Sequence, residues 1–363
     1  MVLNIYILSV VLLTFANGFA YFYFAVKIKR KYPDESQYLN SVVISILWFV
    51  AGISYPFFFP IDDQFRQFYH ILGAQIICIY SYAVVLFLFV VQYIFRIWRH
   101  PEVKEERTID NFLKKFNERN EKKLLDLNEK SHSISTDINR KLFHLIPPGV
   151  IIILWEFAIH FWADVFKQDE LWGITEEEYG VWIIMTIGFT ALMVFAILDY
   201  IRLSFMFEKR NAYHLMPKNL SGIFLKTLKR DEVYELAATA ALILALLPIF
   251  FFPISVFAAA ALISSIGDGA ASLIGIKFGK RHFPKNSKKT ITGYIAGFVV
   301  SFLTAFFVYS IFESSIPFIK IGILSFSGAL VFLIVDLLDL KINDNILNPI
   351  FCGLLMGLLY YVI

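Results

Sequence analysis

Residues 253–294 read PISVFAAAALISSIGDGAASLIGIKFGKRHFPKNSKKTITGY. An apolar run long enough to cross a bilayer contains one carboxylate, Asp268, and ends in a cluster of Lys and Arg before the next apolar run begins. A carboxylate at that position is expensive to keep in lipid, so it is a functional candidate by default. The stretch predicts membrane-spanning helices with a polar site near the end of one of them.

Nine further apolar runs flank this one, so the chain is predicted to be all-α, a polytopic membrane helix bundle of about ten spans. The predicted spans are 3–26, 39–60, 69–95, 142–163, 180–199, 235–251, 253–276, 291–312, 317–338 and 344–363. Only Phe252 and Pro253 separate the sixth from the seventh, which also fits one hairpin with a tight turn. The first run lacks a positive segment before it and a cleavage site after it, so it is interpreted as a retained helix.

Composition excludes several classes of protein. With 58% hydrophobic and 17% charged residues, the chain is not a soluble multidomain protein. Its net charge of +3 gives no indication of a nucleic-acid partner. Two cysteines are too few for a disulfide framework.

The charges of the loops orient the predicted spans. Lys and Arg gather at 27–31, 96–99, 140–141, 202–230 and 277–289, whereas the alternate loops at 62–63 and 164–178 are acidic. By the positive-inside rule both termini are non-cytoplasmic and the loop after Asp268 is cytoplasmic. Asp268 precedes Lys277 by nine residues, which is about 13 Å along a helix. This arrangement suits an integral protein of the endoplasmic reticulum membrane or of a prokaryotic plasma membrane.

Three regions are expected: a three-helix membrane unit (1–97), a charged cytosolic linker (98–138) and a seven-helix membrane domain (139–363). In the linker, Ile109, Phe112, Leu113 and Phe116 follow an amphipathic helical pattern. Such a helix lies on the membrane surface or on a cytoplasmic face of the bundle, although a solvated charged helix fits as well.

Small residues around Asp268 predict room for a ligand. If 268–279 is helical, Asp268, Ala271, Gly275 and Gly279 share one face that has almost no side chain. Something bulky could lie against that backbone. Alternatively, Asp268 caps a helix break between Gly267 and Gly269, and a helix that restarts there would direct its dipole at a phosphate.

The basic loop that follows contains Lys277, Lys280, Arg281, Lys285, Lys288 and Lys289. Membrane topology alone explains most such clusters. Here, however, Lys289 and Thr290 stand at the start of the next span and are followed by Gly293, so a cation and a hydroxyl are available to phosphate. The P-loop pattern is absent.

Three other places carry candidate residues. Arg140 and His144 share a helix face beside Lys141, where the alternative is topology markers and a polar lining histidine. In a predicted loop at 199–234, Glu232 is a candidate base or metal ligand. A snorkelling pair with Lys229 or Arg230 is the alternative there, and the same loop holds Asp199 and Arg202.

Acidic residues near the last predicted cytoplasmic turn form the remaining place, namely Asp336, Asp339, Asp344 and Asn345. Acids on the basic side of a membrane are not a topology signal, so they suggest a role. A helix N-cap at Asn343 or Asp344 is the simpler alternative.

Taken in order, these elements resemble the family of CTP-dependent lipid kinases, which includes dolichol kinase, phytol kinase and a CTP-using diacylglycerol kinase. The matching elements are Arg140-Lys141 with His144, Lys229 to Glu232, Gly267-Asp268 with Ala271, Gly275 and Gly279, Lys288-Lys289-Thr290 with Gly293, and Asp344-Asn345 with Pro349. The resemblance covers 139–363, and one position departs from it, since Thr292 stands where the family usually has Glu. The additional N-terminal helices and the paired lysines favour a polyprenol substrate.

The resemblance implies transfer of the terminal phosphate of CTP to the hydroxyl of an isoprenoid alcohol, dolichol-like or polyprenol-like, at the cytoplasmic membrane face. It implies Mg²⁺ on Asp268, Glu232 and Asp344, and catalytic roles for Asp268, Glu232, Lys289 and His144. The expected nucleotide-binding residues are Gly267, Gly269, Ala271, Gly275, Gly279, Lys280, Lys288, Lys289, Thr290, Gly293, Arg140 and Lys141. The isoprenoid tail would stay in the lipid bilayer. The sequence leaves the oligomeric state open.

Other functions fit parts of the pattern. A phosphatidate cytidylyltransferase that makes a CDP-lipid needs the same nucleotide site, and a phytol or diacylglycerol kinase differs only in its acceptor. The motif of CDP-alcohol phosphotransferases is absent, since no Arg follows Ala271. A transporter could use Asp268 on an ion path but has no need of the Lys-Thr loop. In a purely structural membrane protein, Asp268→Asn would change stability alone.

Overall fold

A computed structural model describes residues 5–33, 37–58, 64–125, 129–220, 222, 238–284, 287, 289–313, 315–338 and 340–363. The described part of the chain is 87% helix and has no strands. A single isolated bridge joins His282 to Thr290. The predicted all-α class is therefore confirmed for these residues.

Nine helical segments among the described residues are long and apolar enough to cross a membrane. They are Ile5–Lys31, Tyr38–Phe58, Phe68–Ile97, His144–Val165, Glu176–Glu208, Ile254–Phe278, Ile291–Phe312, Phe318–Leu338 and Asp344–Val362. The sixth predicted run, 235–251, is represented by the shorter apolar helix Ala240–Phe251. A count of ten spans and the side on which the termini lie stay predictions.

The chain forms two compact units, 1–122 with 150–240 and 123–149 with 241–363. One long helix, α7 (Glu129–Glu156), begins in the second unit and ends in the first. The threefold division expected from the sequence stays a prediction.

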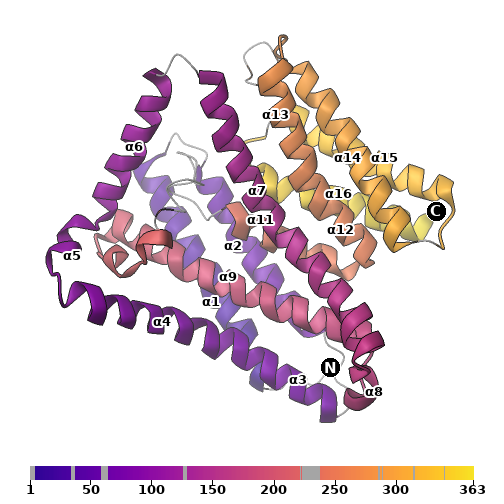
Figure 1. Ribbon diagram of the computed structural model, residues 1–363, viewed down its shortest axis with the longest axis horizontal. Helices are drawn as coiled ribbons and strands as arrows, with labels where there is room; N and C mark the ends of the chain where they lie inside the picture. Colours follow the sequence, from indigo (N-terminus) through magenta and orange to yellow (C-terminus); the bar gives the residue numbers. More distant parts are fainter. Residues whose placement is uncertain are drawn as a thin grey trace. The chain divides into compact units, whose positions relative to one another are not determined.

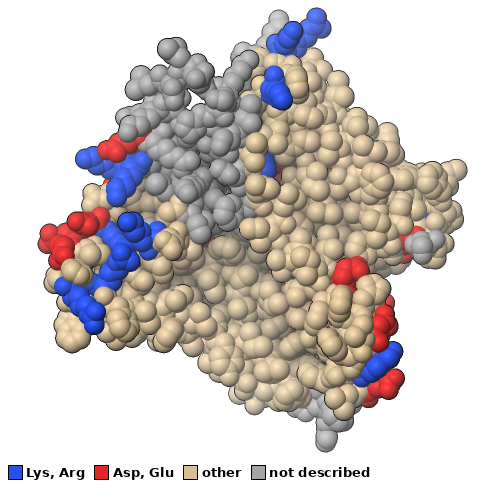
Figure 2. Space-filling model, in the orientation of Figure 1, with Lys and Arg blue, Asp and Glu red and all other residues tan. Residues whose placement is uncertain are grey.

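The first unit contains α1 (Ile5–Lys31), α2 (Gln37–Ser54), α3 (Gln64–Gln75), α4 (Ser81–Gln92), α8 (Gln168–Trp172) and α9 (Glu176–Glu208). Helix α1 packs beside α2, and α9 contacts α1, α3 and α4 (Figure 1). Figure 2 shows charged atoms gathered around α5 (Glu102–Glu106) and α8, whereas the surface along α4 is uncharged. Lipid-facing helices are expected to have such uncharged flanks.

Helix α9 corrects one expectation, because it continues through Asp199 and Arg202, which had been assigned to a loop. The Arg202 guanidinium donates to the Asp199 carboxylate at 2.7 Å, and the two residues are only 6% and 1% exposed. Tyr21 of α1 donates to the same carboxylate at 3.4 Å. Because the charges neutralise one another inside the unit, the helix does not need to end where they occur.

The linker forms α5 and α6 (Ile109–Leu125). Ile109 and Phe112, both buried, pack in one cluster with Leu198, Ile201 and Phe205 of α9. The amphipathic pattern therefore predicted the helix and its buried face, and that face lies on protein.

The second unit contains α11 (Ala238–Leu246, from Ala241 on), α12 (Ile254–Leu262), α13 (Asp268–Phe278), α14 (Ile291–Phe312), α15 (Phe318–Leu338) and α16 (Asp344–Val362). Helix α14 packs against α12, α13 and α15, and α16 packs against α12 and α15 (Figure 1). One π-helical turn, Ile263–Gly267, joins α12 to α13 without a break. The alternative explanation of Asp268, a cap at a helix break between Gly267 and Gly269, is therefore wrong, and no free helix end there points its dipole at a ligand. Turns of this kind often occur at functional sites.

Glycines on α13 and α14 let the two helices approach closely. A Cβ on Gly293 would lie 2.7 Å from the carbonyl oxygen of Ala271, and one on Gly275 would lie 3.0 Å from the Thr290 hydroxyl. A Cβ on Gly297 would meet the Ala271 methyl group at 2.9 Å. This is the small-residue packing that membrane helices use. The idea that this face is open to a bulky ligand is therefore wrong, since α14 fills it.

Candidate functional site

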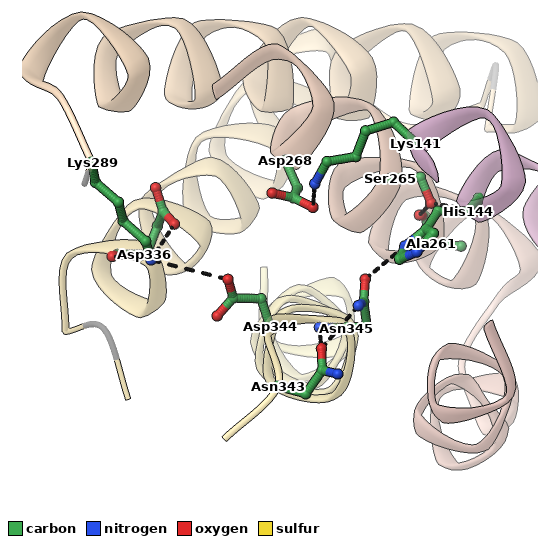
Figure 3. A network of polar contacts seen from close by, with 10 residues as sticks. All are labelled: Lys141, His144, Ala261, Ser265, Asp268, Lys289, Asp336, Asn343, Asp344 and Asn345. Atoms are coloured by element: carbon green, nitrogen blue, oxygen red, sulfur yellow. Dashed lines mark hydrogen bonds and ion pairs between the residues drawn. The ribbon is translucent and has the colours of Figure 1, made fainter. Parts of the chain in front are cut away.

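Two lysine–aspartate pairs meet within the second unit (Figure 3). Lys141 of α7 pairs with Asp268 at the start of α13. Lys289, just before α14, pairs with Asp336 of α15 at 2.9 Å and also donates to the Asp336 backbone carbonyl at 3.0 Å. A third carboxylate, Asp344 of α16, lies 4.0 Å from the same ammonium. Five separate segments of the chain thus bring three carboxylates and two cations together.

Burial makes these contacts stronger than surface ion pairs. The side chains of Lys141 and Asp336 are 8% and 12% exposed, and Asp268 is 20% exposed. Removing one member of such a pair leaves a poorly solvated charge, which is strongly destabilising. Asp344 is more open, at 37%, and Figure 3 shows it between the two pairs. The arrangement keeps an accessible carboxylate beside two lysines that are held in place.

A short hairpin positions Lys289. Phe283 donates its backbone N–H to the Lys289 carbonyl at 3.1 Å, and Ile291 donates to the Arg281 carbonyl at 3.0 Å. The Thr290 hydroxyl then caps α14 by accepting from the N–H of Gly293 at 3.2 Å. A helix that begins at a fixed cap holds the residue before it, so the ammonium of Lys289 is directed at α15 and α16.

His144 lies one turn along α7 from Lys141 and belongs to a second polar arm. Its Nδ1 is 2.8 Å from the amide oxygen of Asn345, and the amide nitrogen of Asn345 is 2.9 Å from the side-chain oxygen of Asn343 (Figure 3). Because Asn345 uses its nitrogen as donor toward Asn343, its oxygen is left to accept from His144. A neutral His144 is then the Nδ1–H tautomer, and its Nε2 is the basic nitrogen. Asn343, rather than Asp344, is the N-cap of α16.

Two prolines in α7 explain how this helix is joined to α13. Pro147 and Pro148 lie inside the helix and have no N–H, so the carbonyls four residues earlier lose their usual partners. One of these carbonyls belongs to His144, and it accepts the Ser265 hydroxyl at 3.0 Å. Hydroxyl groups commonly satisfy such carbonyls in membrane helices. Ser265 lies in the π-helical turn that leads directly into Asp268.

The structure brings together five of the predicted residues, namely Lys141, His144, Asp268, Lys289 and Asp344. Those that contribute instead to the packing of α13 and α14 are Gly267, Ala271, Gly275, Gly279, Thr290 and Gly293. A Cβ added to Gly269 would lie 3.9 Å from the aliphatic stem of Lys141, and Lys280 is exposed on the loop. The structure does not describe Glu232 and Lys288, and it describes Arg140 without its side chain. Nucleotide binding by any of these residues stays a prediction.

Asp336 and Asn345 belong to the site although neither was among the residues assigned to it. The sequence marks Asp336 only as an acid on the basic side of the membrane, and this is the signal that could have placed it. Its partner is 47 positions away. Residues that far apart along the chain give no local pattern, so the pairing with Lys289 could not be predicted.

The donor set suits magnesium only together with a phosphate. Among the described residues no group of three or more His, Cys, Asp or Glu side chains is arranged to hold a metal ion. Magnesium commonly binds through one or two carboxylates plus phosphate oxygens and water. The carboxylates of Asp268 and Asp344 fit that kind of shared coordination.

Comparisons with protein-family models, with curated proteins and with solved structures found no match for this chain.

Proposed function

We propose that this chain is a membrane-embedded lipid kinase that transfers the terminal phosphate of CTP to the hydroxyl of an isoprenoid alcohol. The observation that carries the proposal is the meeting of Asp268, Asp336 and Asp344 with Lys141 and Lys289 within one unit. Phosphoryl transfer requires mainly positioning and neutralisation of charge, and these side chains offer both.

The five charged residues have three roles in this proposal. Asp268 and Asp344 would hold Mg²⁺, which neutralises the phosphates and orients them when bound. Lys141 and Lys289 would hold phosphate oxygens as point charges. Asp336 would position Lys289, since it receives that ammonium through both its carboxylate and its backbone carbonyl.

The acceptor is proposed to be a lipid alcohol because the site lies at the ends of apolar helices. Leu142 and Ile146, next to Lys141 and His144 on α7, are 56% and 53% exposed and give an apolar surface for an isoprenoid tail. His144 would take the proton of the lipid hydroxyl on Nε2, because Asn345 accepts at Nδ1. Glu232, the base preferred from the sequence, stays a further candidate outside the described residues.

CTP as donor rests on the resemblance to the CTP-dependent lipid kinases, whereas the cytoplasmic orientation of the site rests on the positive-inside rule. The five predicted residues that meet in the site, Lys141, His144, Asp268, Lys289 and Asp344, all belong to motifs of that resemblance or to residues that it implies. A cytidylyltransferase would use the same nucleotide site with a phosphorylated acceptor, so the test must follow the α- and γ-phosphates of CTP separately.

The experiment is a transfer assay with purified protein, Mg²⁺ and CTP labelled at either the γ- or the α-phosphate. Polyprenol, dolichol, phytol, diacylglycerol and phosphatidic acid are offered in turn, with ATP as a competing donor. We expect γ-label in a polyprenol or dolichol, loss of transfer in Asp268→Asn, and normal transfer in the matched control Asp164→Asn, whose carboxylate is 67% exposed in the first unit. Incorporation of α-label into phosphatidic acid would identify a cytidylyltransferase instead. If folded protein transfers neither the α-label nor the γ-label to any lipid, both the kinase and the cytidylyltransferase are contradicted.

A further inference from the structure

The groups proposed to bind metal and phosphate are engaged with one another in this structure. Lys141 is paired with Asp268, and the Lys289 ammonium lies 2.9 Å from Asp336 and 4.0 Å from Asp344. A metal ion that arrives alone meets carboxylates already neutralised by ammonium groups. A phosphate that arrives alone meets lysines already held by carboxylates.

We infer that Lys141 and Lys289 are internal counter-cations, and that metal and phosphate bind by an exchange of ion-pair partners. The carboxylates pass from lysine to metal while the lysines pass from carboxylate to phosphate. This inference rests on the proposed function, in that the site takes a metal-bound phosphate ligand, and deepens it: the site discriminates against either component alone.

Burial is the reason why the pairs form without a ligand. Lys141 and Asp336 are at most 12% exposed on their side chains, so each needs a charged partner at all times. With all five groups ionised, three carboxylates and two ammonium groups leave one negative charge, which repels a phosphate but is too small to hold a divalent ion firmly. Metal and phosphate together restore every pair, because each freed lysine meets a phosphate oxygen.

Lys289 has the geometry that an exchange requires. Its ammonium lies between two carboxylates at different distances, and its side chain is 26% exposed. A small rotation of the lysine therefore releases Asp344, the most exposed of the three acids, without leaving the ammonium unpaired.

The test measures binding of Mn²⁺ alone, by the resonance signal of the free ion, to the full-length protein in detergent. We expect Lys141→Met and Lys289→Met each to bind Mn²⁺ at least tenfold more tightly than the unmodified protein, because each frees a carboxylate. The gain should vanish in the double variant Lys141→Met/Asp268→Asn. Lys320→Met is the matched control, since this lysine lies at the opposite end of α15 over the Tyr360 ring and should leave the affinity unchanged.

A second arm measures pyrophosphate binding with metal removed by a chelator. Asp336→Asn should bind pyrophosphate at least tenfold more tightly, because it removes the closer of the two carboxylates that hold the Lys289 ammonium. Lysine variants that bind Mn²⁺ no more tightly than the unmodified protein, or an Asp336→Asn variant that binds pyrophosphate no more tightly, would overturn the exchange. If Lys141→Met fails to fold, Lys289→Met decides the first arm, because the pair it breaks includes the more exposed lysine.

Neither arm contains CTP or lipid, so the result is separable from the transfer assay. An exchange without kinase activity would leave a metal–phosphate site that serves another reaction. If the protein has kinase activity but the variants do not bind Mn²⁺ or pyrophosphate more tightly, the proposed function stands and the exchange of ion-pair partners is rejected.

Discussion

Replacing Gly293 by alanine tests whether the contact between α13 and α14 sets the geometry of the site. The new Cβ would lie 2.7 Å from the Ala271 carbonyl oxygen and 3.3 Å from the Gly275 Cα, and both of these are backbone atoms. Neither can rotate away, so the two helices must separate. Overpacking of this kind costs about 1–3 kcal/mol.

A second glycine supplies the control for the intrinsic effect of alanine. Gly322 of α15 has nothing within 4 Å of an added Cβ. Replacing glycine by alanine inside a helix stabilises the helix by about 1 kcal/mol through helix propensity alone. Both variants gain most of this stabilisation, so it largely cancels when they are compared. The difference between Gly293→Ala and Gly322→Ala therefore isolates the clash, at about 1–3 kcal/mol.

The assay follows unfolding of the second unit through its buried cysteine. Cys352 of α16 is 0% exposed, so a thiol-reactive dye labels it only after that unit opens. A Cys78→Ala background removes the other thiol. For a domain of this size each kcal/mol shifts the midpoint by about 2–4 °C. We expect Gly293→Ala to unfold at the lower temperature and to transfer phosphate more slowly, because Asp268 begins the displaced helix. Equal midpoints for the two glycine variants would refute the packing argument.

Three further outcomes are expected. Asp268→Asn should lower transfer by at least about 100-fold, since electrostatic stabilisation by one positioned group is worth that much, and activity within a few fold of the unmodified protein would contradict the role. Asn345→Leu should lower kcat about tenfold with little change in KM and shift the acidic limb of the kcat–pH profile, and an unshifted profile would mean that Asn345 does not set the state of His144. The first unit should lose stability as pH falls because of His214. Burial, and after it the charge of Lys104, lowers the pKa of His214 in the folded protein below the ordinary 6.5. As pH falls, the unfolded chain therefore binds a proton at a higher pH than the folded chain does, and unfolding is favoured. Unfolding midpoints followed by the fluorescence of the six tryptophans, all of which lie in the first unit, should therefore fall between pH 7.5 and 5.5, and less so in His214→Gln.

Hydropathy predicted most of the helices because lipid imposes a minimum apolar length that the sequence must show. The predicted run 291–312 coincides with the observed α14. Helix α9 is different, since it continues to Glu208 although the predicted run ends at 199. A hydropathy window ends a predicted span wherever charged residues such as Asp199 and Arg202 enter it. The pairing of Asp199 with Arg202 and Tyr21, which removes the need to end the helix, depends on the packing of α1.

The glycine face shows a second limit of reasoning from one segment. Spacing placed Asp268, Ala271 and Gly275 on one face, and the structure agrees that the backbone there can be approached closely. What approaches it is α14, through Gly293 and Gly297. A bare helix face has the same sequence whether its occupant is a ligand or another helix, so only the fold decides between them.

The two prolines of α7 have a mechanical consequence. The turn that bears His144 lacks the two backbone hydrogen bonds that Pro147 and Pro148 would otherwise donate, and one of those carbonyls accepts the Ser265 hydroxyl, which also lies 3.1 Å from the Ala261 carbonyl. Bending α7 at this turn therefore disturbs fewer hydrogen bonds of the helix ladder than bending an ordinary helix does. The segment with Lys141 and His144 can therefore pivot at this turn, and two side-chain contacts oppose the movement, namely Ser265 on the His144 carbonyl and Asp268 on the Lys141 ammonium.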